Sequence, residues 1–560
     1  MKRTLPILFL FVCFHVLAEE PTRITGPLTA EGYIDYHKAL EKKTYPPELA
    51  TDDNGLRVFV RLFGDVGDYH REMTAEDREF FRRQKYEKLG LDPNVPPTLV
   101  LPKEPHQFLE DLYKARGEEV PRTLRDAPWT LERFPMLADW FKEIDKPLDA
   151  IAETIRKPVF CPPLLQSPES VRSGIPQNLI AVFLPDLQTS RAIGRILQAR
   201  ADNRIALGNI DGAIDDKLTA HRLGRLLPPR GPIVQHLIGI AIEGMAMSIP
   251  VGGNPEYPLT EQQIRRILHG LDALPPRTST TDALEWERHM ALSAIQELRI
   301  VSEQGTDFGF LEAGGFGPQA PQILNIITNA VSFDWDVVDR RMNEVYDALK
   351  KPPPREEFKS IMEEVESIRP GNWQWLARTM LTPDGPARLV ANMFIALFVP
   401  ALDAYEEGVR RSECQENMHR LALAIKLYQL ETGKMPDENW AAQIEKYLGR
   451  NVERYFSCPS NPSPKGSTTY ALIQFGGVVI GSPETLVLIE LTEPVPMDKA
   501  VVSLDEVFEL VPGKRVQEGE RVRRISPHPG GMMTTNRSGA VRFLSASTSE
   551  AELLRLLGGE

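Results

Sequence analysis

Apolar residues in the middle of the chain recur every three or four positions, which is the spacing of an α-helix with one buried face. This pattern predicts helices from Ile193 to Leu207 and from Ile210 to Leu227, and two prolines stop the second one. The next segment, Ile233 to Ile249, is apolar on nearly all sides, so we expect a buried helix. Two further helices should open at Thr260-x-x-Gln263 and Asp282-x-x-Glu285, where a side chain can cap the first turn. Antiparallel helix pairs with short loops follow from this spacing.

A second, longer apolar stripe lies in the last third of the chain. Cys414, Met418, Leu421, Ile425 and Tyr428 follow one another at spacings of four, three, four and three, which places them on one face of a single helix. A Gly-Lys-Met-Pro segment then ends that helix.

Beyond the long helix the pattern changes from helical to strand-like. Strands are predicted at Thr468–Ile473, Gly477–Ile480, Leu486–Leu491 and Ala540–Leu544, and Ser549-x-x-Glu552 caps a last helix. One long helix followed by a small antiparallel sheet is an α+β arrangement. The predicted fold class is therefore α+β, with a mostly α-helical N-terminal region before this helix and sheet.

The N-terminal part is rich in proline, and helical pieces are predicted there only at Glu76–Leu89, Gln107–Ala115 and Met136–Ile155. At 560 residues the chain should form two or three domains. The predicted division is a leader at 1–18, a mixed region at 19–180, an α-helical hairpin domain at 181–385 and an α+β domain at 386–560.

The first residues have the three parts of a secretory signal peptide. Lys2 and Arg3 give a positive start, Leu5–Leu17 is apolar, and small residues around Ala18 suit a signal peptidase. The best later candidate for a membrane helix, Leu389–Leu402, has roughly 14 residues where about 20 are needed. We therefore expect an exported protein of the periplasm or cell surface, with no membrane span in the mature chain.

Charge argues against a nucleic-acid partner. The formal charge of −13 becomes −15 when Lys2 and Arg3 leave with the leader, and an acidic chain is repelled by phosphates. The one local basic group, Arg521, Arg523 and Arg524, lies among glutamates and is interpreted as a solvated loop.

Three cysteines remain after the leader: Cys161, Cys414 and Cys458. The last two fall in the same expected domain of an exported protein, so they are a candidate disulfide. Such a bridge would stabilise the domain by about 4 kcal/mol in the chain-entropy model. No CxxC pair is present, which disfavours a zinc or thioredoxin-like site.

Two segments resemble known families. Ala206–Ala213 looks like the turn of a tetratricopeptide hairpin, but no clean second copy follows, and an ordinary helical hairpin is the favoured interpretation. The last third resembles type IV pilin-like proteins and major pseudopilins. The matching features, in order, are Pro400, Ala401-Leu402, Arg410-Arg411, Cys414, Asn417-Met418, Leu421–Ala424, Tyr428, Gly433-x-x-Pro436, Trp440, Cys458-Pro459-Ser460 and Thr469-Tyr470-Ala471.

The tail is similar to the H-X9-DG signature associated with prepilins. His528 and Gly539 hold its histidine and glycine positions, and Ser538 stands where the family has aspartate. The leader is of the ordinary secretory kind and the long helix is internal. The resemblance therefore implies a pilin-like module reused within a larger protein, rather than a filament subunit.

Candidate metal ligands are few. His528 lies on a tight loop between prolines and could bind a metal, although a hydrogen bond to the turn is the favoured role for a lone histidine. Asp334, Asp336 and Asp339 could hold a hard cation, but on a helix they point in different directions.

A second possible ligand set lies on the helices of the hairpin domain. Glu285 and His289 share a helix face at i, i+4, with His221 and His236 not far away in sequence, so a two-histidine, one-carboxylate site is conceivable. An exposed ion pair is the favoured account of Glu285. We expect no metal and no cofactor.

The leading functional hypothesis is a secreted, non-enzymatic structural or protein-interaction protein, with other envelope proteins as partners. One alternative is a tetratricopeptide-like periplasmic scaffold. A third is a metal-dependent hydrolase in the helical domain, although no G-x-S-x-G, H-E-x-x-H or P-loop pattern occurs.

Overall fold

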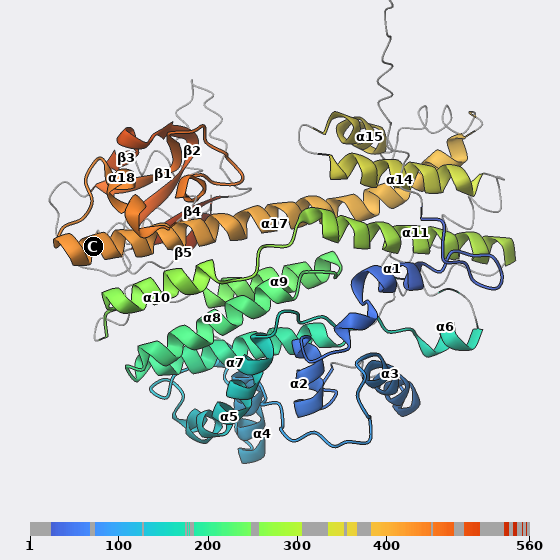
Figure 1. The fold of residues 1–560 in the computed structure, drawn as a ribbon, viewed down its shortest axis with the longest axis horizontal. Helices are drawn as coiled ribbons and strands as arrows, with labels where there is room; N and C mark the ends of the chain where they lie inside the picture. The colour runs from blue at the N-terminus through green and yellow to red at the C-terminus, as the bar shows by residue number, and fades with distance from the viewer. Residues whose placement is uncertain are drawn as a thin grey trace, which may run out of the picture. The chain divides into compact units, whose positions relative to one another are not determined.

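The computed structural model of the chain is shown in Figure 1. It describes residues 24–67, 73–125, 128–173, 184–247, 257–304, 334–351, 355–366, 384–449, 452–474, 486–503, 531–536 and 541–545, together with residues 176, 179, 382, 552 and 556. The expected leader, the basic group at 521–524 and His528 lie outside these residues.

The chain divides into two compact units. Unit 1 comprises Met1–Ala39, Asn178–Ile180 and Arg288–Leu397, and unit 2 comprises Leu40–Gln177, Ala181–Glu287 and Phe398–Glu560. Two of the boundaries fall inside long helices, at residues 287/288 and 397/398. Changes in composition along the sequence could not reveal such boundaries, because a helix continues through them.

The helices described in the N-terminal part include three that match the predicted ones within two residues and three that were not predicted. They are α1 (Tyr36–Thr44), α2 (Gly55–Phe63), α3 (Ala75–Lys88), α4 (Pro105–Arg116), α5 (Ala138–Ile155) and α6 (Pro168–Ser173). Local chemistry fixes their ends: the Thr74 side chain accepts a hydrogen bond from the Asp77 backbone amide at 3.0 Å, and Gly117 ends α4 in the left-handed conformation. The predictions for 76–89, 107–115 and 136–155 are thus confirmed by α3, α4 and α5.

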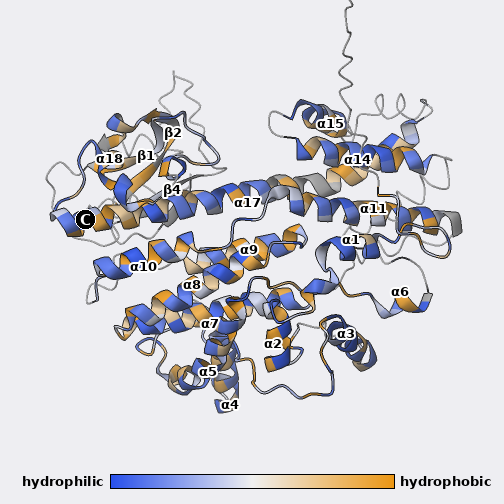
Figure 2. Ribbon diagram, viewed as in Figure 1, coloured by the Kyte–Doolittle hydropathy of each residue, from blue (hydrophilic) through white to orange (hydrophobic). Residues whose placement is uncertain are grey.

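The predicted helical hairpins are also present. They are α7 (Asp186–Ala206), α8 (Ile210–Leu226), α9 (Ile233–Ala246), α10 (Glu261–Asp272) and α11 (Thr280–Gln304). The capping box at Thr260 and Gln263 forms as expected. Figure 2 shows α9 as hydrophobic over much of its length, in agreement with its burial.

Glycines allow α8 and α9 to approach each other closely. A Cβ added to Gly224 would lie 2.7 Å from the Gly239 carbonyl oxygen, and one added to Gly239 would lie 2.6 Å from the Gly224 carbonyl oxygen. Real Cβ atoms do not come this close, so the two helices touch through their backbones. This contact brings the side chains on either side of it together.

The C-terminal part combines one long helix with a sheet. Helix α17 (Gly385–Thr432) has 48 residues and ends at Gly433, whose φ is 73°. After α18 (Trp440–Ile444) come β1 (Ser467–Gln474), β2 (Leu486–Pro496), β3 (Val501–Ser503), β4 (Gly531–Asn536) and β5 (Val541–Ser545). The sheet order is β3-β1-β2-β4-β5, and all neighbours are antiparallel except β1 and β3.

The coarse α+β prediction is therefore confirmed, with two differences in the sheet. Strands β3 and β4 were not predicted, and β3 makes the sheet mixed rather than purely antiparallel. The strand expected at 477–480 lies outside the described residues. No helix in the described part of the chain is long and apolar enough to span a bilayer.

The apolar stripe of α17 lies in one core with the sheet. This core contains Cys414, Met418, Leu421 and Ile425 of α17. It also contains Tyr470 and Leu472 of β1, Leu488 of β2, Met533 of β4, and Ile264, Ile267, Leu268 and Leu271 of α10. The helix predicted from the stripe is thus packed on the sheet and on α10 at the same time.

Unit 1 has its own small set of helices. It contains α14 (Trp335–Lys350) and α15 (Glu356–Glu366), together with parts of α11 and α17. Arg288 is almost fully buried there and donates to the Asn343 side-chain oxygen and to the Asp347 carboxylate, each at 2.8 Å.

Candidate functional site

A group of charged residues, buried apart from the half-exposed Asp272 and the partly exposed Arg277, lies in unit 2, where α8, α9 and α17 meet the connection between α10 and α11. We call its seven members the charged cluster. They are His221, Arg225, Glu243, Asp272, Arg277, Glu416 and Arg420. Local periodicity places them: His221 and Arg225 are one turn apart on α8, and Glu416 and Arg420 are one turn apart on α17.

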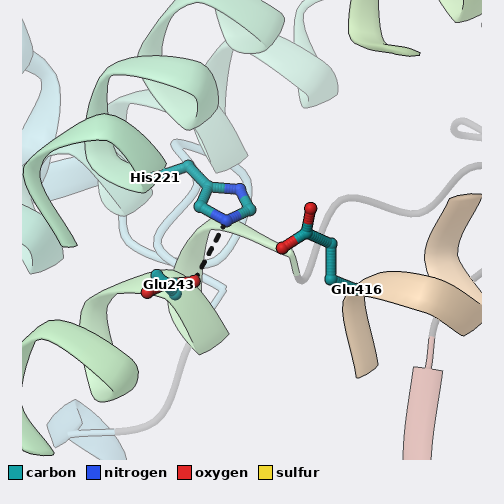
Figure 3. A group of neighbouring side chains, drawn as sticks. All are labelled: His221, Glu243 and Glu416. Atoms are coloured by element: carbon teal, nitrogen blue, oxygen red, sulfur yellow. Dashed lines mark ion pairs between the residues drawn. The ribbon is translucent and has the colours of Figure 1, made fainter. Parts of the chain in front are cut away.

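Glu243 is at the centre of the α8–α9 side of the cluster. Its Oε2 atom lies 3.3 Å from His221 Nε2, 2.8 Å from Arg225 Nε and 3.0 Å from Arg277 Nη2. Its side chain is only 2% exposed. Figure 3 shows the His221 ring directed at this carboxylate. One buried carboxylate oxygen therefore faces three nitrogen-bearing side chains from two different segments.

Glu416 brings α17 into the same cluster. Its Oε2 atom accepts from Arg277 at 2.9 Å and also from Arg225, and its Oε1 atom accepts from Arg420 at 3.1 Å. Arg420 in turn donates to Asp272 at the end of α10, at 2.6 Å. The ion pairs thus run without interruption from α8 to α10 through α17.

Electrostatics keep both glutamates of the cluster ionised. Burial by itself raises the pKa of Glu243, but Arg277, His221 and Arg225 outweigh it and hold the pKa below its usual value. Burial likewise raises the pKa of Glu416, and Arg225 and Arg277 again reverse the shift. Three guanidinium groups face three carboxylates, so the cluster is neutral when His221 is neutral.

The arrangement also has to be considered as a metal centre. His221 Nε2 and one carboxylate oxygen each of Glu243 and Glu416 lie within 4.8 Å of one another, and a histidine with two carboxylates is a common ligand type. However, Arg225 and Arg277 already donate to both carboxylates. A divalent cation would add two charges to a buried cluster that is already neutral, which is costly in a low dielectric. The geometry fits an ion-pair network better than a metal centre.

The structure distributes the sequence-predicted ligands over separate places. Glu285 forms an ion pair with Lys43 at 2.6 Å, as expected for an exposed pair. His236 Nδ1 hydrogen-bonds the Tyr405 hydroxyl at 2.8 Å, and burial lowers the pKa of this histidine to about 4. His289 belongs to unit 1, where its ring packs edge-on against Tyr36 at 6.5 Å.

The three aspartates proposed for a hard cation have helix-related roles. Asp334 caps α14 by accepting a hydrogen bond from the Asp336 backbone amide at 2.9 Å. Asp336 pairs with Arg299 at 3.3 Å, and the Asp339 backbone carbonyl accepts from Asn343. Helix capping accounts for the first of these residues, and solvent-exposed pairing accounts for the second.

The predicted Cys414–Cys458 disulfide is not formed in the structure, where both residues carry thiols. Both are fully buried in the core shared by α17 and the sheet. Cys414 Sγ lies 3.2 Å from the Tyr470 hydroxyl, and Cys458 Sγ accepts from the Ser460 backbone amide at 3.3 Å. Placement in one domain brought the residues into one core, but it did not determine their bonding. Cys161 is also buried, and burial raises the pKa of its thiol to about 12.

Sequence reasoning recognised only His221 among the members of the charged cluster. One signal was present: Glu243 is the only Asp, Glu, Lys or Arg in the mostly apolar helix α9. A carboxylate on the buried face of a helix needs a cationic partner. The partners themselves come from α8, from the α10–α11 connection and from α17, and such distant pairings cannot be read from one sequence.

A cleft of about 930 Å³ opens beside the charged cluster. Its charged lining includes Arg225, Arg277, Arg420 and Arg454 and, opposite in sign, Asp272, Glu413 and Glu416. Most of these arginines are bound to carboxylates of the cluster itself. The guanidinium group of Arg454 lies 4.7 Å from the centre of the Tyr455 ring. The cleft therefore offers little uncompensated charge to a ligand.

No protein-family model, no curated protein and no solved structure matches this chain.

Proposed function

We propose that this protein is an exported, non-enzymatic structural or protein-interaction protein of the cell envelope, with a pilin-like module in its last third. The observation that carries the proposal is the packing of the α17 stripe on the sheet. In pilin-like proteins a long helix lies on a small, mainly antiparallel sheet. Here Cys414, Met418 and Leu421 of α17 share a core with Tyr470 and Leu488 of that sheet.

The charged cluster supports a structural role over a catalytic one. Its two glutamates, Glu243 and Glu416, are held by guanidinium groups from other segments, so neither is placed to act as a base or a metal ligand. What the network does is tie α17 to α8 and α9. A module fixed in this way presents its surface from a rigid support, which reduces the entropy lost when a partner binds.

The packing of α7, α8 and α9 favours one second candidate, a tetratricopeptide-like scaffold. A Cβ added to Gly194 of α7 would lie 3.2 Å from Ile242 of α9, so α7 contacts α9 as well as its hairpin partner α8. Helices of a repeat array contact the next repeat in the same way. Under this candidate the hairpins, and not the C-terminal module, would carry the binding surface.

The test combines export with partner capture in the native cell. We expect a mature N-terminus at Glu19 and recovery of the chain from the envelope fraction, whereas a leaderless version starting at residue 19 should stay in the cytoplasm. Photo-crosslinkers placed at exposed positions of the module, such as Glu438, and of the α7–α8 turn, such as Leu207, then report which surface contacts envelope proteins. Crosslinks from Leu207 alone would favour the scaffold, and an uncleaved chain in the cytoplasm would overturn the proposal.

A further inference from the structure

A second cavity, of about 370 Å³, lies in the C-terminal α+β region, within the size range of ligand pockets. Four short segments form it: α18 with the 3-10 helix Glu445–Tyr447 after it, the 3-10 helix Val452–Phe456, the turn before β1, and the 3-10 helix Met497–Lys499. We call it the α18 pocket. It differs from the cleft beside the charged cluster in the chemistry of its floor and rim.

The floor of the α18 pocket is apolar and firmly held. Ala441, Val452, Phe456 and Met497 provide it. Phe456 is 2% exposed and packs on the buried ring of Trp440, with 5.6 Å between ring centres. The Trp440 indole donates to the Ala500 carbonyl at 2.8 Å, and the Met497 amide donates to the Gly466 carbonyl at 3.2 Å. The pocket is therefore preformed, and a ligand would not have to order it.

The rim of the pocket is acidic. It has three carboxylates, Glu445, Glu453 and Asp498, against one ammonium group, Lys465, which gives a net formal charge of −2. Glu453 faces Lys465 at 3.6 Å, with side chains 65% and 86% exposed, so this is a weak pair. Glu445 and Asp498 have no side-chain hydrogen bond or ion pair within the described part of the chain. In contrast to the charged cluster, these carboxylates leave negative charge for a ligand.

We propose that the α18 pocket binds a lysine side chain of a partner protein. A lysine has an apolar four-carbon stem and a compact cationic end, which match an apolar floor under a rim of carboxylates. The net charge of the rim repels an anionic ligand. A hydrated metal ion would gain nothing from the apolar floor. The inference rests on the proposed interaction function and specifies the chemistry of the partner.

The probe for this proposal is n-butylammonium, which reproduces the end of a lysine side chain. Met497 lines the pocket, so its methyl group, labelled with ¹³C in the full-length mature protein and assigned with Met497→Leu, reports occupancy by NMR. We expect n-butylammonium to shift this signal in a saturable way, and the neutral n-butanol to bind more weakly. Added salt should weaken the binding of n-butylammonium but not that of n-butanol, because exposed charge pairs are screened.

Variants test whether the rim provides the attraction. Glu445→Gln with Asp498→Asn should raise the Kd for n-butylammonium about tenfold, at about threefold for each exposed carboxylate. Glu438→Gln, which removes an exposed acid outside the pocket lining, should leave the Kd unchanged. Unchanged signals of the other methionines show that the variants are folded. Equal binding of n-butanol, or an unchanged Kd in the double variant, would overturn the proposal.

The test of the α18 pocket can fail or succeed independently of the test of the proposed function. Binding of n-butylammonium at Met497 by a protein that stays in the cytoplasm would retain the pocket and reject the envelope role. An exported protein that crosslinks to partners but shows no shift at Met497 would retain the function and reject the pocket.

Discussion

Replacement of Glu416 by glutamine should be among the most destabilising polar substitutions in the C-terminal half of the chain. The carboxylate is 11% exposed and accepts from Arg225, Arg277 and Arg420. Glutamine keeps the shape but removes the charge, so three buried guanidinium groups would face two carboxylates instead of three. Removing one partner of a buried ion pair costs about 3–5 kcal/mol, and we expect a loss of this size in the free energy of unfolding.

The assay is urea unfolding at pH 7, followed by tryptophan fluorescence, with Glu431→Gln as the matched control. Glu431 is also on α17, but it is 50% exposed and pairs with the exposed Lys446 at 3.0 Å. Its neutralisation should cost far less than that of Glu416, because exposed charge pairs contribute little to stability. Similar losses in the two variants would refute the reasoning, because the cluster would then contribute no more than a surface pair.

The effect should also depend on pH in a defined direction. Burial raises the pKa of Glu416, but Arg225 and Arg277 outweigh it and the pKa in the folded protein lies below the unfolded value. The stabilisation it provides is therefore fully present above the unfolded pKa, near 4.5, and is lost as pH falls through the folded pKa. The difference between the wild type and Glu416→Gln should shrink as the medium is made strongly acidic. A difference that grows toward low pH would contradict this assignment.

Three further predictions concern the helices of unit 2. Burial raises the pKa of Glu287 to about 7, so the wild type loses stability as pH rises from about 4.5 to 7. Urea midpoints should show Glu287→Gln to be more stable than the wild type by at most about 3 kcal/mol at pH 8, and no more stable at pH 4. In calorimetry, Gly224→Ala should destabilise the protein by about 1–3 kcal/mol, because the added Cβ would meet the Gly239 carbonyl. The control Gly244→Ala has open space around the added Cβ and should stabilise the protein by up to about 1 kcal/mol. Burial lowers the pKa of His236 to about 4, so its NMR signals should not titrate between pH 5 and 8, and its protonation should cost stability only as pH falls below about 6.5. An NMR titration midpoint near pH 6.5 would contradict its burial.

Periodicity predicted many of the helices and three of the strands, β1, β2 and β5. The stripe Cys414 to Tyr428 predicted α17, and the turn at 207–209 separated α7 from α8, because each signal is local. The sequence did not reveal β3, whose three residues pair in parallel with β1. A strand that short has no period to recognise, and its pairing depends on where the chain returns.

In contrast to the helices, the candidate site could not be predicted from local sequence patterns. His221 and Glu285 were noticed as possible metal ligands through their residue types, yet one is part of an ion-pair network and the other is in an exposed pair. Two other members of this network, Arg277 and Glu416, are 56 and more residues away from His221 along the chain. Residue type defines what a side chain can do, and only its neighbours define what it does.

Glycine contacts and buried charges together explain why the α8–α9 pair holds α17 in place. The backbone contact at Gly224 and Gly239 brings Arg225 of α8 within 2.8 Å of Glu243 of α9. Held on one side by Glu243, Arg225 keeps a second nitrogen directed at Glu416 of α17. A larger residue at either glycine would separate the two helices and with them the two halves of this ion-pair network. Gly224→Ala and Glu416→Gln should therefore be less than additive when combined, because the first change already weakens the contact that the second removes.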